Sequence, residues 1–174
     1  MVHIYSGMGR GKTSILNGTM IRALGNDLNV LYLRFFKNRP SGEITFFNKL
    51  DLDNLKIKSF YHVSKKFIWE MDEEEIKLMK VDMIKGWNYF KKAVSEKKYD
   101  MIVCDEMTDL VVNKFLTKEE FIKEINKVDK NIDVLISGHN KVEDIKECAD
   151  LYTELVSIKH YFDQGVIAKK GIEF

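Results

Sequence analysis

A glycine-rich segment near the start of the chain has the residues of a phosphate-binding loop. It follows the apolar run 2–5 and consists of Gly7, Met8, Gly9, Arg10, Gly11, Lys12, Thr13 and Ser14. In such loops, backbone N–H groups and the positive end of the following helix face an anion, and the lysine adds a mobile charge. The segment lacks one residue of the usual G-x-x-x-x-G-K-[ST] pattern. It predicts a nucleotide phosphate site whose geometry differs from that of ordinary terminal phosphoryl transfer.

An acidic pair, Asp105 and Glu106, follows the apolar run 101–104. Together with the Thr13 hydroxyl, these carboxylates supply the oxygen ligands that Mg²⁺ prefers, bound directly or through water. Taken alone, the pair is equally consistent with a solvated strand end, and the loop with a tight strand-to-helix turn. Because both signals occur in one chain, each supports the other. We predict Mg²⁺ binding by Thr13, Asp105 and Glu106.

The residues of the loop have distinct expected roles. Lys12 is a point charge for bridging or terminal phosphate oxygens, and the glycines let the backbone approach the phosphates. Arg10 either adds charge beside them or faces water. Met8 lies over the nucleotide or at the loop tip. We therefore predict that the whole segment 7–14 binds nucleotide.

Six short apolar runs alternate with helical patterns along the chain. The runs span 2–5, 30–35, 56–60, 101–104, 132–136 and 151–156. The longest helical pattern places six apolar residues on one face at spacings of three and four. They are Ile76, Met79, Met83, Trp87, Phe90 and Val94. Strands that alternate with helices predict an α/β fold with a mainly parallel sheet, whose ligands bind at the carboxyl ends of the strands.

Two helix starts carry capping residues. Asp72 is followed by Glu75, and Thr117 by Glu120, at the spacing with which a side chain caps the first free N–H groups of a helix. The first pair precedes the long apolar face, and the second opens a shorter helix. Both helices are expected to pack on the sheet.

The composition excludes several classes of function. With 28 basic and 27 acidic residues, the chain has no global field that would draw it onto nucleic acid or an anionic membrane. No apolar run approaches the roughly 20 residues of a membrane span. Cys104 and Cys148 lie far apart without C-x-x-C spacing, which favours free thiols in a reducing cytoplasmic compartment. At 174 residues, the chain is expected to form one domain, residues 1–174.

Several motifs together resemble one known family. They are the loop at 7–14, the segments 22–25 and 35–37, the acids at 105–106 and the ending 158–174. The ending reads K-H-x-F-D-x-G-x-x-A-x-x-G-I-E-F from residue 159 to residue 174, which is highly specific. The chain resembles the P-loop type of ATP:corrinoid adenosyltransferases, also called cob(I)yrinic acid a,c-diamide adenosyltransferases. The resemblance extends from residue 2 to the last residue.

The resemblance implies transfer of the 5'-deoxyadenosyl group of ATP to the Co(I) of a reduced corrinoid, with triphosphate leaving. It implies a three-layer, RecA-like P-loop NTPase fold, Mg²⁺ as cofactor, an electron donor for Co(II) and a homodimer. Lys12 and Glu106 are then the catalytic residues, and Arg22 joins the loop in binding nucleotide. Because Co(I) is itself a very strong nucleophile, no serine, cysteine or general base is required.

The resemblance also implies where the corrinoid binds. Phe67 and Trp69 match the family's F-x-W-E motif and would fill the lower face of the corrinoid, within a loop near residues 61–71. His160 and Phe162 would form part of the site wall, in a C-terminal tail at 157–174. From composition alone, both rings of the F-x-W-E motif would be assigned to the core.

Two positions depart from the family pattern. His139 stands where members usually have arginine, so the cation there depends on protonation, and Met8 replaces a common asparagine. These changes put nucleotide affinity and rate in question. A catalytically weak protein that binds ATP and corrinoid for delivery or sensing is therefore an alternative, and a P-loop ATPase is a second one. The sequence leaves open whether the natural acceptor is a biosynthetic intermediate or salvaged cobalamin.

Overall fold

The computed structural model describes residues 1–37, 40–61, 66, 68–140 and 142–173. Six strands form one sheet in the order β3-β2-β4-β5-β1-β6. They are β1 (Val2–Ser6), β2 (Val30–Arg34), β3 (Leu55–Ser59), β4 (Met101–Asp105), β5 (Asp133–Ser137) and β6 (Leu151–Glu154). Every neighbouring pair is parallel. The sequence prediction of a mainly parallel sheet is confirmed, and each strand lies close to its predicted bounds.

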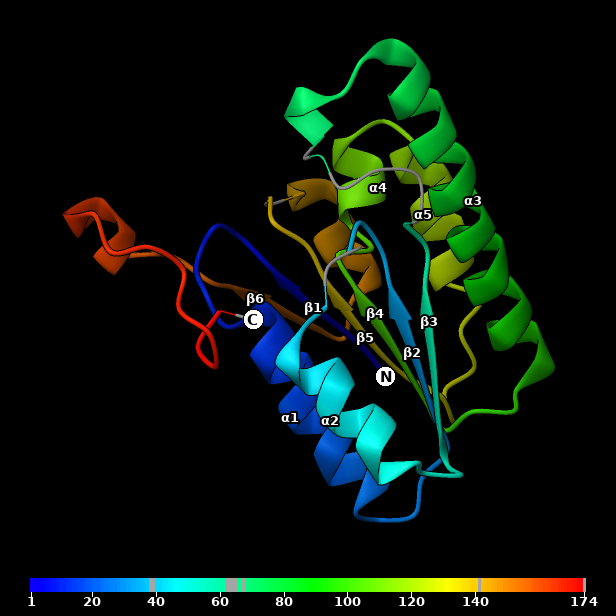
Figure 1. Ribbon diagram of the computed structural model, residues 1–174. Helices are drawn as coiled ribbons and strands as arrows, with labels where there is room; N and C mark the ends of the chain where they lie inside the picture. Colours follow the sequence, from blue (N-terminus) through cyan, green and yellow to red (C-terminus); the bar gives the residue numbers. More distant parts are fainter. Residues whose placement is uncertain (38–39, 62–65, 67, 141, 174) are drawn as a thin grey trace.

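Helices cover both faces of the sheet, as Figure 1 shows. On one face lie α1 (Lys12–Leu24) and α2 (Gly42–Leu50). On the other lie α3 (Glu73–Glu96), α4 (Asp109–Val112) and α5 (Lys118–Ile125). Three short 3-10 helices complete the described elements: η1 (Ile68–Glu70), η2 (Glu143–Cys148) and η3 (Tyr161–Gln164). The expected three-layer α/β architecture is therefore confirmed.

The alternation of side chains along β4 explains why helices cover both faces. Met101 and Val103 belong to a buried cluster with α1 and α2, whereas Ile102 and Cys104 belong to a second cluster with α3, α4 and α5. A parallel strand that is apolar on both faces needs a helical layer on each of them. Burial of these two apolar faces is the main term that stabilises the layers.

The long helix α3 begins and packs as the sequence predicts. Asp72 accepts hydrogen bonds from the backbone N–H groups of Glu74 and Glu75, and the Glu75 side chain accepts one from the Asp72 N–H. These bonds satisfy free donors of the first turn. The predicted apolar face is buried from Met79 to Val94, with Ile76 packed at its edge. Thr117 likewise caps α5 by accepting from the Glu120 N–H at 3.1 Å.

The strand order determines which segments meet at the carboxyl edge of the sheet. Strand β5 lies between β1, which leads into the loop at 7–11, and β4, which ends at Asp105. After β6 the chain leaves the sheet, carries η3 outward and returns toward the start of α1 (Figure 1). In the described part of the chain, no helix is both long and apolar enough to cross a membrane.

Candidate functional site at the carboxyl edge of the sheet

The phosphate loop rests on the backbone that follows β6. The Gly9 N–H donates to the Leu155 carbonyl at 2.8 Å. A Cβ atom at Gly9 would lie 2.7 Å from the Leu155 carbonyl carbon, and one at Gly7 would lie 2.4 Å from its oxygen. Gly7 also has φ +106°, a conformation that side chains rarely adopt. Glycine is thus required here by a contact inside the protein, in addition to the expected approach of phosphate.

Lys12 is bonded into the loop that precedes it. Its ammonium donates to the carbonyl oxygens of Gly7 at 2.6 Å and Gly9 at 2.9 Å, and the residue is buried. Burial lowers the pKa of Lys12, while the charges of Asp109, Glu106 and Asp105 act in the opposite direction. An ammonium has three N–H donors, so one remains for an anion in front of the loop.

The start of α1 faces the same space. Gly11 is its N-cap, and among the described residues no side chain caps it. The first N–H groups of the helix therefore stay available to an anion, which the helix dipole also favours. Thr13 is half-buried, Ser14 is exposed and Met8 is 74% exposed at the loop tip. The first turn of α1 is suited to bind phosphate.

Asp105 connects the loop to the end of β4. It is fully buried and accepts hydrogen bonds from Thr13 Oγ1 at 3.2 Å, Tyr32 Oη at 3.2 Å and Ser137 Oγ at 2.6 Å. Lys37 Nζ lies 2.5 Å from its Oδ2. Burial raises the pKa of Asp105, but the charge of Lys37 and these hydrogen bonds outweigh burial and lower it. Asp105 is therefore an ionised carboxylate in contact with α1.

Lys37 has no role in the sequence prediction. It follows β2, and its ammonium contacts Thr13 Oγ1 at 2.8 Å and Glu106 Oε1 at 3.5 Å in addition to Asp105. Burial lowers the pKa of Lys37, but the charges of Asp105 and Glu106 outweigh it, so the pKa is raised. The sequence signal was the place of Lys37 in the segment 35–37, which carries part of the family resemblance. Strand order supplies the reason for the contact: β2 neighbours β4, so a residue just after β2 reaches the acids at the end of β4.

Glu106 has a strained backbone next to this pair. Its φ of 64° lies in the left-handed region, which costs a residue other than glycine about 1–3 kcal/mol. Its N–H donates to Ser137 Oγ at 2.9 Å, and the same hydroxyl donates to Asp105. Ser137 thus links the Glu106 backbone to the Asp105 carboxylate, a role that the sequence did not reveal. Burial raises the pKa of Glu106 to about 7, despite the nearby charge of Lys37.

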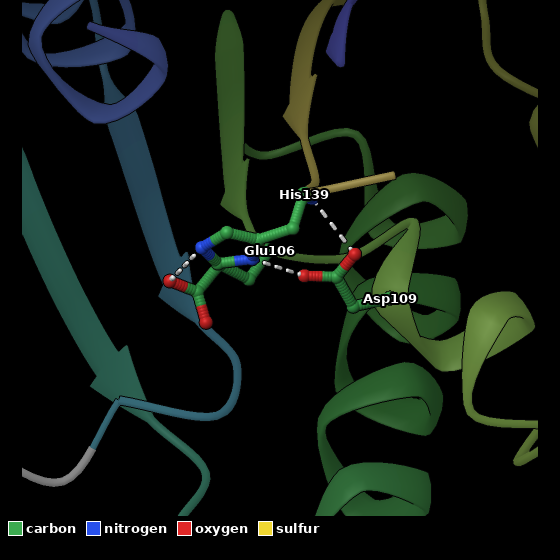
Figure 2. A group of neighbouring side chains, drawn as sticks. All are labelled: Glu106, Asp109 and His139. Atoms are coloured by element: carbon green, nitrogen blue, oxygen red, sulfur yellow. Dashed lines mark hydrogen bonds and ion pairs between the residues drawn. The ribbon is translucent and has the colours of Figure 1, made fainter. Parts of the chain in front are cut away.

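His139 lies between two acids at the end of β5, as Figure 2 shows. Its Nδ1 is 2.7 Å from Asp109 Oδ2, its backbone N–H donates to Asp109 Oδ1 at 2.9 Å, and its Nε2 is 3.9 Å from Glu106 Oε1. The hydrogen bond with Asp109 raises the pKa of His139. The imidazole therefore carries a positive charge over a wider pH range than a free histidine does.

Arg10 binds the returning tail. Its Nη2 donates to the Ile172 carbonyl at 2.7 Å and lies 3.2 Å from Glu173 Oε2. Its guanidinium carbon is 5.5 Å from the centre of the Tyr161 ring. The sequence left two roles open for Arg10, charge beside the phosphates or a side chain that faces water, and neither describes this contact. Arg10 links the phosphate loop to residues 161–173 of the tail.

These features place a glycine-rich anion site beside an acidic strand end. The family model described as ATP:corrinoid adenosyltransferase BtuR/CobO/CobP matches residues 1–174. The chain belongs to the ATP:corrinoid adenosyltransferase family. The resemblance drawn from the motifs is confirmed across the whole chain.

Relatives of this adenosyltransferase support the same assignment. The corrinoid adenosyltransferase CobA of Salmonella typhimurium is 32% identical over 175 residues, covering 100% of this chain and 85% of that protein. The corrinoid adenosyltransferase of Escherichia coli K12 is 30% identical with the same coverage.

Among solved structures, domain III of the Thermotoga maritima replication initiation protein DnaA matches with a TM-score of 0.42 and 19% identity. That match covers 89% of this chain and 54% of the other.

Most of the nucleotide residues predicted for this adenosyltransferase meet at one site. The loop 7–11, Lys12, Thr13, Asp105 and Glu106 gather at the carboxyl edge of the sheet. Arg22 does not join them: it is exposed in the last turn of α1, ten residues from Lys12, or about 15 Å along the helix. The structure therefore separates Arg22 from the loop along α1, and its role in nucleotide binding stays a prediction.

The predicted corrinoid residues lie in two segments. Phe67 falls outside the described residues, and of Trp69 only the place in η1 is described. In the tail, the His160 Nδ1 accepts from the Phe162 N–H at 3.1 Å and so caps η3. Phe162 is 71% exposed. Phe162 directly follows Tyr161, whose ring Arg10 of the phosphate loop contacts.

Proposed function

We propose that this chain transfers the 5'-deoxyadenosyl group of ATP to the Co(I) of a reduced corrinoid. In this reaction the electron pair of Co(I) forms a Co–C bond to C5', the bond between C5' and the triphosphate oxygen breaks, and triphosphate leaves with its electron pair. The site geometry alone would suit many P-loop proteins. The observation that selects this reaction is the family match across residues 1–174.

The loop is proposed to stabilise the leaving triphosphate. Lys12 keeps one N–H donor toward the space in front of the loop, and the first N–H groups of α1 point into the same space. Donors fixed in place before reaction stabilise charge as it develops without further reorganisation. His139, when protonated, adds a cation beside them. Because the substrate supplies the nucleophile, catalysis depends on placement and charge.

Mg²⁺ is proposed as the cofactor, held by Thr13, Asp105 and Glu106. The residues fit such an ion: Thr13 Oγ1 lies 3.2 Å from both Asp105 oxygens, and the donors are oxygen atoms, which Mg²⁺ prefers. When bound, the ion would neutralise part of the triphosphate charge. The protein residues would position it, and Ser137 donates a hydrogen bond that fixes the Asp105 carboxylate.

The remaining features of the proposal concern the corrinoid and the cellular setting. We assign the segment 61–71, with Phe67 and Trp69, and the tail 157–174, with His160 and Phe162, to corrinoid binding within one P-loop domain. An electron donor for Co(II), a homodimer and a cytoplasmic location are proposed from the family pattern. Both cysteines are free thiols, which supports a reducing compartment.

An anaerobic assay tests the reaction. Chemically reduced corrinoid, ATP and Mg²⁺ should yield light-sensitive adenosylcorrinoid and inorganic triphosphate. Lys12→Ala should abolish the product, whereas Lys49→Ala, which removes an exposed lysine on α2, should leave the rate unchanged. Release of ADP and phosphate without an alkylated corrinoid would contradict the proposal and favour an ordinary ATPase.

A second variant tests the platform role of Trp69. Trp69→Ala should slow the reaction that starts from Co(II) corrinoid and a reductant. It should spare the reaction that starts from chemically prepared Co(I), because the ring is proposed to remove the lower ligand before reduction. Equal losses from both starting states would reject this role.

A further inference from the structure

The ammonium of Lys37 lies among the same side chains that are proposed to hold Mg²⁺. Its Nζ is 2.5 Å from Asp105 Oδ2, 2.8 Å from Thr13 Oγ1 and 3.5 Å from Glu106 Oε1. We propose that Lys37 takes the place of the metal ion in the nucleotide-free protein, so that magnesium enters by exchange for this ammonium. The inference rests on the proposed metal-binding residues.

Charge balance explains why a cation belongs there. Asp105 is fully buried and is followed directly by Glu106, whose side chain is 14% exposed. Two adjacent carboxylates out of water repel each other, and a buried carboxylate without a cation tends to take up a proton. Ser137 and Tyr32 donate hydrogen bonds to Asp105 but carry no charge. Lys37 is therefore the cation that compensates this pair.

The contacts also explain why the two cations exclude each other. A magnesium ion binds its oxygen ligands at about 2.0–2.1 Å. If it took Thr13 Oγ1 and Asp105 Oδ2 as ligands, it would share both oxygen atoms with an ammonium at 2.5 and 2.8 Å. Repulsion between a divalent ion and an ammonium at such close range permits only one of them in that place.

Other cations near the acids do not occupy this place. Lys12 Nζ is bonded to the carbonyl oxygens of Gly7 and Gly9, and His139 approaches Glu106 only to 3.9 Å. Lys37 reaches the acids from the end of β2, on the opposite side of β4 from β5 and its His139. Free divalent ions must therefore compete with Lys37 in the nucleotide-free site and bind only weakly, and the metal ion enters together with the triphosphate that attracts it.

Manganese binding to the nucleotide-free protein tests this inference, with Mn²⁺ as an EPR-visible substitute for Mg²⁺. Removing the ammonium in Lys37→Met should tighten Mn²⁺ binding by about tenfold or more, the scale on which one neighbouring charge shifts proton affinity. Lys37→Arg, which keeps a cation, should bind as weakly as the wild type. Adding Asp105→Asn to Lys37→Met should abolish the gain.

Lys37→Gln provides a second neutral variant, since its amide can still donate hydrogen bonds to Asp105 if the methionine variant does not fold. If neither neutral variant binds Mn²⁺ more tightly than the wild type does, the inference is overturned. A purely structural role for Lys37 predicts that result together with a lower melting temperature. The measurement needs neither ATP nor corrinoid. Adenosyl transfer by the wild type is assayed separately. It shows whether the proposed function holds even if the Lys37 inference fails.

Discussion

Replacing Gly9 by alanine should destabilise the protein even without nucleotide. The added Cβ would lie 2.7 Å from the Leu155 carbonyl carbon and 2.8 Å from both the Leu155 oxygen and the Val156 nitrogen. All three are backbone atoms, which cannot rotate away as a side chain could. Overpacking of this kind costs about 1–3 kcal/mol. The shift would also weaken the hydrogen bond from Gly9 N–H to Leu155, worth about 0.5–1.5 kcal/mol.

Thermal unfolding followed by circular dichroism measures this effect. A loss of about 2 kcal/mol lowers the melting temperature of a chain of this size by about 4–8 °C. Gly18→Ala is the matched control, because Gly18 lies within α1 and a Cβ there meets nothing within 4 Å. Alanine at that position should stabilise the helix by about 0.5–1 kcal/mol.

Nucleotide binding separates the two reasons for a glycine in the loop. If Gly9 serves only the approach of phosphate, Gly9→Ala should weaken ATP binding in calorimetry and leave the melting temperature of the free protein unchanged. That outcome would refute the argument from Leu155. A lower melting temperature of the free protein, with Gly18→Ala melting higher, would support it.

Three further predictions concern charge at the site. Burial raises the pKa of Glu106 to about 7, so the stability linked to its protonation is complete below about pH 4.5 and is lost as pH rises through 7. Urea unfolding of Glu106→Gln should lack this part of the decline, and parallel profiles would contradict the assignment. The hydrogen bond with Asp109 raises the pKa of His139, so wild-type ATP affinity should fall as pH rises from about 6 to about 9. Calorimetry on His139→Arg should show a flatter profile than the wild type, and an equally steep one would exclude a charge role. Arg10→Ala should free the tail and speed tryptic cleavage after Lys169 by up to about fivefold, since an exposed ion pair contributes at most about 1 kcal/mol. An unchanged cleavage rate, read by mass spectrometry, would show that Arg10 does not hold the tail.

Local pattern explains the parts of the fold that were predicted correctly. The run 101–104 is apolar at every position, which is typical of a strand covered on both faces, and its alternate residues enter two different clusters. Asp72 caps α3 because its partner Glu75 is within one helical turn. Such features depend on residues within a few positions of one another, so sequence spacing is sufficient to locate them.

Contacts across the sheet account for what the sequence did not reveal. Lys37 and Asp105 are 68 positions apart, and their meeting depends on β2 and β4 being neighbours. Leu155 reaches Gly9 because β6 lies beside β1. Arg22 is close to the phosphate loop in the sequence but distant from it in the structure, because α1 carries it to the end of the helix away from the loop. Neither spacing nor composition encodes the order of strands in a sheet.

The sequence by itself determined the α/β class, the phosphate loop, the acidic strand end and the family, because motifs and hydrophobic periods are local properties of the chain. Only the tertiary structure decided which cation faces Asp105, why Gly9 must lack a side chain and where Arg10 binds. Those outcomes depend on strand order and on side chains brought together from distant segments. In a buried site, the charge of each group is set by the neighbours that the fold places around it.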